Sequence, residues 1–116
     1  MKIITAMVQT FMLSRVTSAL EDIDAFPGMT VTDVRGFGRE KASHARGAPH
    51  RVIEDFVEYV KKERIEIVAP DEMVDLIVET IVRAARTGNP GDGKVFVWPV
   101  ERAVRIQTGD KDNAAL

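Results

Sequence analysis

The feature that most limits the possible folds is one segment order, strand–helix–strand, that occurs twice along the chain. In each copy a short β-branched or apolar run is followed by apolar residues at helical spacing and then by another β-type run. The segments are 2–8, 15–24 and 29–38 in the first copy, and 64–70, 72–86 and 94–101 in the second. Two β-α-β units predict an α+β domain of the ferredoxin-like type, βαββαβ, with a four-stranded antiparallel sheet and two helices on one face.

Both predicted helices carry end signals. Ser14 is a good N-cap for the first helix, and "DAFPG" ends it. Pro70-Asp71 opens the second helix, Arg83 and Arg86 suit the dipole of its last turns, and Gly88 follows as a stop. These signals place one amphipathic helix between each pair of strands.

The stretch between the two units is less regular. Residues 39–50 are polar and contain Gly and Pro without a period, whereas residues 51–63 (RVIEDFVEYVKKE) place apolar residues where either a helix or a strand could bury them. The sequence leaves that choice open.

Several strand positions are apolar on both sides. Ile3 and Ile4 in the first strand, and residues 95–98 (VFVW) in the last, run almost without alternation. A strand buried on both faces needs a second layer, and the chain has too few helices to supply one. Self-association is therefore expected.

Residues 86–94, "RTGNPGDGK", form a glycine-rich loop. Gly88, Gly93 and Lys94 fit part of a P-loop, but the next residue is Val95, where that motif needs the Ser or Thr hydroxyl that holds Mg²⁺. A P-loop also precedes its helix, whereas this loop follows one. It is therefore not a P-loop, yet it can turn backbone N–H groups toward an anion.

Composition excludes several classes of function. A chain of 116 residues with no cysteine and a net charge of −2 predicts one domain without disulfides, and its basic residues form no block that would indicate nucleic acid binding. No apolar run approaches the roughly 18 residues of a membrane span, so direct membrane insertion is not expected. We expect a cytoplasmic location. No nucleophile–base set indicates an enzyme.

Four blocks in the correct order carry a resemblance. "GMTVTDVRGFGREK" (28–41), "RIEIVAPDEMVD" (64–75), "IVRAARTGNPGDGKVFVWPVERAVRIQTGD" (81–110) and the ending "AAL" resemble the PII nitrogen-regulatory signal proteins. The match spans nearly the whole chain except residues 39–63. It implies a single PII-like domain over 1–116 and a homotrimer that binds ATP or ADP in the clefts between subunits.

The resemblance also implies a flexible T-loop within residues 37–63 that docks on a regulated target, such as a membrane transporter or an enzyme. Residues 86–94 would be the nucleotide-binding loop. The implied ligands are Gly91, Asp92, Gly93 and Lys94 at the phosphates, Gly36, Gly38 and Arg39 beside them, Thr30 and the backbone near Val68 at the adenine, and Arg105 of a neighbouring subunit at the phosphates. A polyphosphate needs such glycine N–H groups and cationic side chains.

Four positions bear on the co-effector. Gln107 stands where the family has a second arginine. The loss of that charge is expected to weaken the preference for a triphosphate over a diphosphate. Glu40 replaces the glutamine that helps ligate Mg²⁺ and 2-oxoglutarate; a carboxylate can still hold Mg²⁺ with ATP but repels the 2-oxoglutarate dianion. Gln9 replaces a commonly basic residue, whereas Lys62 matches the lysine that pairs with 2-oxoglutarate. Binding of 2-oxoglutarate is therefore left open.

The T-loop sequence departs most from the family. His50 occupies the position of the modified tyrosine, Ala48 that of a phosphorylated serine, and Tyr59 lies elsewhere, so covalent modification at these positions is not expected. His44 and His50, with Glu40, could contribute to a metal site, but two histidines without a local ligand set are usually solvated. Three alternatives stay open: a metal-responsive trimer, a sensor of a small anion such as bicarbonate or a carboxylate, and a weak nucleotide hydrolase.

Overall fold

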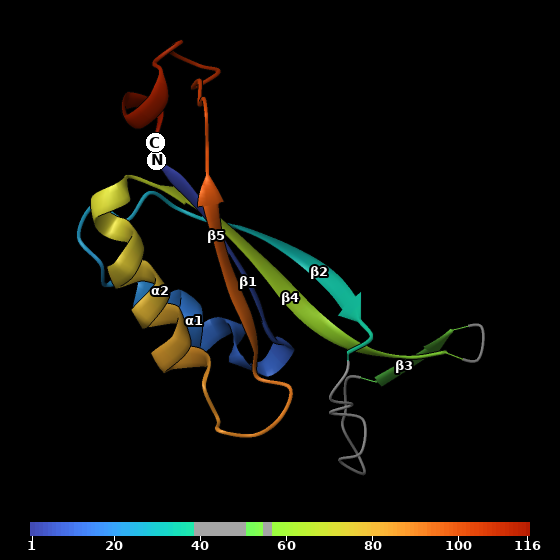
Figure 1. Ribbon diagram of the computed structural model, residues 1–116. Coiled ribbons are helices and arrows are strands. Elements are labelled where there is room, and N and C mark those ends of the chain that lie inside the picture. The colour runs from blue at the N-terminus through green and yellow to red at the C-terminus, as the bar shows by residue number, and fades with distance from the viewer. Residues whose placement is uncertain (39–50, 55–56) are drawn as a thin grey trace.

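The computed structural model of the chain describes residues 1–38, 51–54 and 57–116 (Figure 1). Its elements follow in the order β-α-β, a hairpin arm, and β-α-β. They are β1 (Lys2–Gln9), the 3₁₀ helix η1 (Thr10–Met12), α1 (Leu13–Glu21), β2 (Thr30–Gly36), β3 (Arg51–Glu54), β4 (Val57–Ala69), α2 (Asp71–Ala85), β5 (Gly93–Pro99) and the 3₁₀ helix η3 (Asp112–Ala115).

The main sheet has the strand order β2-β4-β1-β5, and β3 pairs with β4 outside that path. Every pairing is antiparallel. The order confirms the predicted ferredoxin-like α+β fold, because β1 and β4 lie at the centre and each β-α-β unit contributes one central and one edge strand.

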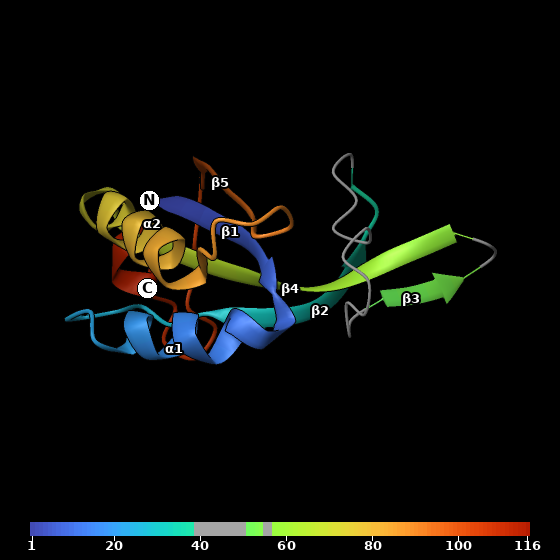
Figure 2. The ribbon, with the colours of Figure 1, turned by 90° about the horizontal axis from the view of Figure 1, so that it is seen from below.

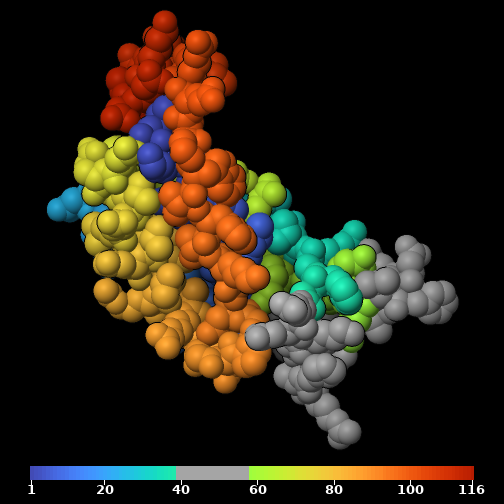
Figure 3. All heavy atoms as spheres, in the orientation of Figure 1, coloured from blue at the N-terminus to red at the C-terminus, as the bar shows by residue number. Residues whose placement is uncertain are grey.

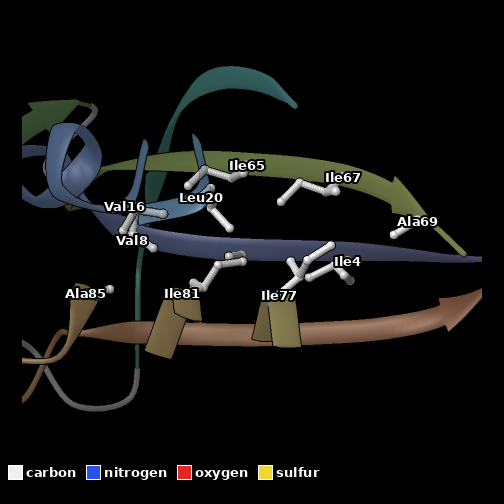
Figure 4. Packing of buried hydrophobic residues seen from close by; sticks show 11 residues of the cluster. Ile4, Val8, Val16, Leu20, Ile65, Ile67, Ala69, Ile77, Ile81 and Ala85 are labelled. Carbon is white, nitrogen blue, oxygen red and sulfur yellow. The ribbon is translucent and has the colours of Figure 1, made fainter. Parts of the chain in front are cut away.

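The core lies between the sheet and the two helices, which cover the same face. Alternate residues of β1 and β4 point toward one apolar stripe of each helix, as Figure 4 shows. The cluster consists of Ile4, Ala6, Val8, Val16, Leu20, Ile65, Ile67, Ala69, Ile77, Ile81 and Ala85. Complete burial of each large aliphatic side chain stabilises the fold by about 1.5–3 kcal/mol.

The other face of the sheet has no helical cover in the described part of the chain. Phe96 and Trp98 alternate with the residues of β5 that face the helices, and about half of each aromatic side chain is exposed. This agrees with the expectation of an uncovered apolar face. No helix in the described ranges is both long and apolar enough to cross a membrane.

The first helix differs from its prediction. The Ser14 N-cap is wrong: α1 begins at Leu13, directly after η1, and the residue at its N-cap is Met12. Met12 is only 5% exposed, so its burial in the core starts the helical turn earlier than the polar signal indicates. The helix also ends at Glu21 rather than at residue 24, and turns closed by Ile23 follow it.

The open choice within residues 51–63 is settled as extended for residues 51–54 and 57–63, and residues 55 and 56 lie outside the described part of the chain. β4 begins at Val57, seven residues before the predicted start, and its first residues pair with β3 while Val60 also pairs with Gly36 of β2. Figure 2 shows this hairpin arm reaching away from the helices. The predicted bounds of β2 and β5 differ from the observed ones by at most two residues.

Candidate functional site

The glycine loop between α2 and β5 is held in shape by Asp92. One carboxylate oxygen, Oδ2, accepts from the backbone N–H of Thr87 at 2.8 Å and of Gly88 at 2.9 Å, and Oδ1 accepts from the Thr87 hydroxyl. Burial alone would raise the pKa of Asp92, but these hydrogen bonds and the nearby Lys62 ammonium together lower it. Asp92 therefore stays ionised and organises the loop from within.

Gly93 is required by the close approach of two strands. Its φ is +109°, and a Cβ at this position would lie 1.7 Å from the carbonyl oxygen of Met7. Only glycine allows the loop to enter β5 so close to β1. Gly88, with φ +88°, and Gly91, with φ +95°, are the other left-handed positions of the loop.

Lys62 connects β4 to this loop. Its ammonium donates to the carbonyl oxygen of Gly91, and its strand position is opposite Gln9 of β1 and Val34 of β2. The side chain is half-buried, and burial lowers the pKa of Lys62 despite the opposing effect of Asp92. The lysine that is expected to bind a co-effector thus contacts the glycine loop.

The residues expected to bind nucleotide fall into two groups. Gly36 ends β2 opposite Val60, close to the strand position of Lys62, and exposed Lys94 follows the loop. These residues form the loop-end group: Gly36, Lys62, Gly91, Asp92, Gly93 and Lys94. Gly38 lies just beyond β2 and is exposed. Arg39, Glu40, His44, Ala48 and His50 lie outside the described residues.

The other group lies at the opposite end of the sheet. Val68 pairs with Ile3, which on its other side pairs with Trp98, five residues along β5 from Gly93. That spacing amounts to about 17 Å of extended strand. The terminal-end group consists of Val68, Arg105 and Gln107. Thr30 belongs to neither end, because it pairs with Glu66, which is opposite Thr5 in the middle of β1. Figure 3 shows the glycine loop and the C-terminal residues at the two ends of the molecule.

Arg105 and Gln107 belong to a small C-terminal lobe, residues 102–116. The lobe is closed by an isolated bridge between Val104 and Lys111 and by a 2.8 Å hydrogen bond from the Arg105 N–H to the Asp110 carbonyl. The Arg105 guanidinium donates to two backbone oxygens, from Nε to Ala115 at 3.3 Å and from Nη2 to Leu116 at 3.0 Å. Sequence reasoning missed this contact, because nothing in "AAL" signals a partner for an arginine.

The exposed surface of the lobe includes Gln107 and Ile106, whose side chain is fully solvent-accessible. Across the described ranges, no three His, Cys, Asp or Glu side chains gather to hold a metal ion.

Comparison with known proteins agrees with the fold. The family model described as "Nitrogen regulatory protein P-II" matches residues 1–110. The chain is 47% identical, over the whole of both chains, to "Nitrogen regulatory protein P-II 1" of Escherichia coli (strain K12). It is 46% identical, again over both full lengths, to the "Nitrogen regulatory protein P-II" of Haemophilus influenzae and to that of Klebsiella oxytoca. The chain therefore belongs to the PII family of nitrogen-regulatory signal transduction proteins.

Proposed function

We propose that this PII protein senses ATP and ADP at sites formed between neighbouring subunits of a homotrimer. One observation carries the proposal: the loop-end group and the terminal-end group lie at opposite ends of one sheet. A single polyphosphate cannot reach Lys94 and Arg105 of the same chain, because β5 separates them. A neighbouring copy that brings its terminal end to the loop end completes the site.

The uncovered face of the sheet supports association. Phe96 and Trp98 expose about half of their side chains on that face, and aromatic residues are typical of interface cores. Burying these rings against another copy provides the second layer that the apolar strand pattern calls for.

The chemistry of the two groups suits a nucleotide. Gly91 and Gly93 supply flexible backbone, Lys94 an exposed ammonium, and Arg105 a guanidinium that suits phosphate oxygens. Gln107 adds no charge, so ADP is bound nearly as well as ATP. Mg²⁺ accompanies ATP, with the Glu40 carboxylate as its expected ligand.

The output passes through the T-loop to a target protein, such as a membrane transporter or an enzyme. Both β2 and β4 lead from the loop-end group into residues 37–63. ATP and ADP favour different T-loop arrangements only through their different contacts there, since a ligand shifts populations by its differential affinity. The protein acts in the cytoplasm as a regulator and not as an enzyme.

One observation favours a small anion as co-effector. Lys62 is a half-buried cation opposite the neutral Gln9, and it is held by the Gly91 carbonyl. A carboxylate or bicarbonate that displaces this carbonyl gains a charge-assisted contact. The dianion 2-oxoglutarate is disfavoured beside Glu40.

Paired variants test the intersubunit site. Lys94→Ala and Arg105→Ala are each expected to weaken ATP and ADP binding by about tenfold or more in calorimetry, since each loses a charged phosphate contact. Trimers assembled from both variants together contain one intact site each, so strong binding returns at a reduced number of sites. Unchanged affinity in either single variant, no recovery in the mixture, or a monomer in light scattering contradicts the proposal.

A further inference from the structure

We propose that the backbone of residues 115 and 116 is a positioning element that presents the Arg105 guanidinium to the phosphates of the bound nucleotide. The inference rests on the proposed function, because it takes Arg105 as a phosphate ligand. It adds that the last two residues of the chain set the affinity although they make no contact with the ligand.

The argument starts from the donors of the guanidinium. Arginine has five N–H donors on a rigid plane. In the structure Nε donates to the backbone oxygen of Ala115 and Nη2 to the backbone oxygen of Leu116, so one edge of the guanidinium is occupied by two acceptor oxygens. Three N–H donors stay available, and two of them are parallel at the end of the group. That arrangement suits a phosphate, which arginine binds through two parallel N–H bonds.

The chain is folded so as to bring these backbone oxygens back to Arg105. The Asp112 N–H donates to the Ala103 carbonyl at 2.8 Å, and the Asp112 carboxylate accepts from the Ala103 N–H at 3.3 Å. From there η3 turns the chain, with hydrogen bonds from Ala114 to Lys111 and from Leu116 to Asn113. Asp112 adopts a φ of +54° to begin this turn, a conformation that persists in non-glycine residues only when the surroundings fix it.

Burial supports the same conclusion. Ala115 and Leu116 are half-buried, whereas Arg105, Ile106 and Gln107 are exposed. The end of the chain is thus the packed part of the lobe, and the arginine lies on its surface with one side anchored. A long flexible side chain that is already ordered loses less conformational freedom on binding, which raises affinity.

Deletion of residues 115 and 116 from the full chain tests this inference. We expect ATP and ADP affinity to fall by about tenfold, a change of the size that one lost charge-assisted hydrogen bond produces. Leu116→Ala is the matched control, because it keeps both backbone oxygens and should bind like the unmodified protein. Arg105→Lys should bind ATP and ADP as weakly as the deletion variant does, because a lysine ammonium cannot bind the backbone oxygens with one edge and a phosphate with another.

Two further measurements separate positioning from general damage to the lobe. In an Arg105→Ala background the deletion should have no further effect on affinity, which a double-mutant cycle measures. Without nucleotide, the Arg105 Nε–H resonance should be protected from solvent exchange in the full chain and lose that protection in the deletion variant. Light scattering checks that both remain the same oligomer.

The outcomes distinguish the inference from the function on which it rests. Unchanged or increased nucleotide affinity in the deletion variant overturns the inference, because the tail would then be irrelevant to Arg105 or in competition with phosphate; the proposed function stands as long as Arg105→Ala weakens binding. A full chain that binds neither ATP nor ADP overturns the proposed function itself.

Discussion

The two ends of the sheet are built in different ways. At the loop end, Lys62 of β4 binds the Gly91 carbonyl and Gly93 lies against Met7 of β1, so the loop is part of the sheet. In the C-terminal lobe, the hydrogen bonds of residues 103–116 within the described chain all stay inside the lobe. The loop end is therefore held by contacts to the strands of the sheet, whereas the lobe is held by hydrogen bonds within itself and forms a separate unit.

This difference predicts how substitutions at the two ends should behave. A change in the glycine loop disturbs strand pairing, so it should alter stability and ligand binding together. A change in the lobe should alter binding with little effect on stability. The loop-end contacts involve β4, and both β2 and β4 lead into residues 37–63, the proposed T-loop.

Gly93→Ala should have the largest effect. The added Cβ would be 1.7 Å from the Met7 carbonyl oxygen, in a backbone conformation that already disfavours alanine. Left-handed strain and overpacking together should lower the free energy of unfolding by about 3 kcal/mol or more, and nucleotide binding should be lost with it. Urea denaturation and calorimetry at a fixed protein concentration measure both effects.

Gly109→Ala is the matched control in the lobe. Gly109 also has a positive φ, +76°, but no atom lies within 4 Å of the added Cβ. We expect a loss of only about 1 kcal/mol. If Gly109→Ala destabilises the protein as much as Gly93→Ala, the lobe is not a separate unit and the comparison fails.

Asp92→Ala should have an intermediate effect. It removes the acceptor of three hydrogen bonds that shape the loop, which should lower the free energy of unfolding by about 1–2 kcal/mol and weaken ATP binding. The lowered pKa of Asp92 means that its contribution is complete above the ordinary value of 3.8 and is lost as the pH falls through the folded-state pKa. Acid titration of stability should therefore be less steep in the variant.

Asp110→Ala is the corresponding change in the lobe, where the carboxylate accepts from the Thr108 hydroxyl. Its effect on the free energy of unfolding should be at most about 0.5 kcal/mol. A larger loss from Asp110→Ala than from Asp92→Ala reverses the proposed difference between the two ends.

Most of the fold could be predicted from sequence, because the helices and inner strands have clear periods. The early start of β4 could not, since residues 51–63 suit a helix as well as a strand and pairing with β2 and β3 decides between them. The start of α1 was missed for a similar reason: the burial of Met12 depends on the assembled core. Local propensity does not predict the bounds of an element when tertiary contacts determine them.

The candidate site was predictable in part. The glycine loop and Lys94 stand out in the sequence, and family resemblance adds Arg105. The contact between Lys62 and Gly91 joins residues 29 positions apart, and no spacing rule links them. The internal role of Asp92 was hidden as well, because a carboxylate beside glycines also suits ligand binding. The roles of Arg39, Glu40 and the two histidines stay predictions.

A buried carboxyl group at the loop end should make stability depend on pH. Glu63 is 6% exposed on the helix-covered face, and its strand position is opposite Asp33 and Val8. Burial raises the pKa of Glu63 above its ordinary value of 4.5, and a hydrogen bond with Asp33 raises it further.

A carboxyl group with a raised folded-state pKa contributes fully to stability below 4.5, and the contribution is lost as the pH rises through the folded-state pKa. Glu63→Gln is neutral at every pH, so it should match the unmodified protein at pH 4 and have a higher free energy of unfolding at pH 8, because it has no carboxylate to ionise in the buried position. Urea denaturation at both pH values measures this. Glu66→Gln, in the middle of the sheet opposite Thr5, is the control. Oε1 of Glu66 lies 3.0 Å from Nη2 of Arg64, and the side chain is more exposed, so its replacement should give no gain at pH 8. A loss of stability at pH 8 in Glu63→Gln would show that the ionised carboxylate supports the loop end, contrary to its burial beside Asp33.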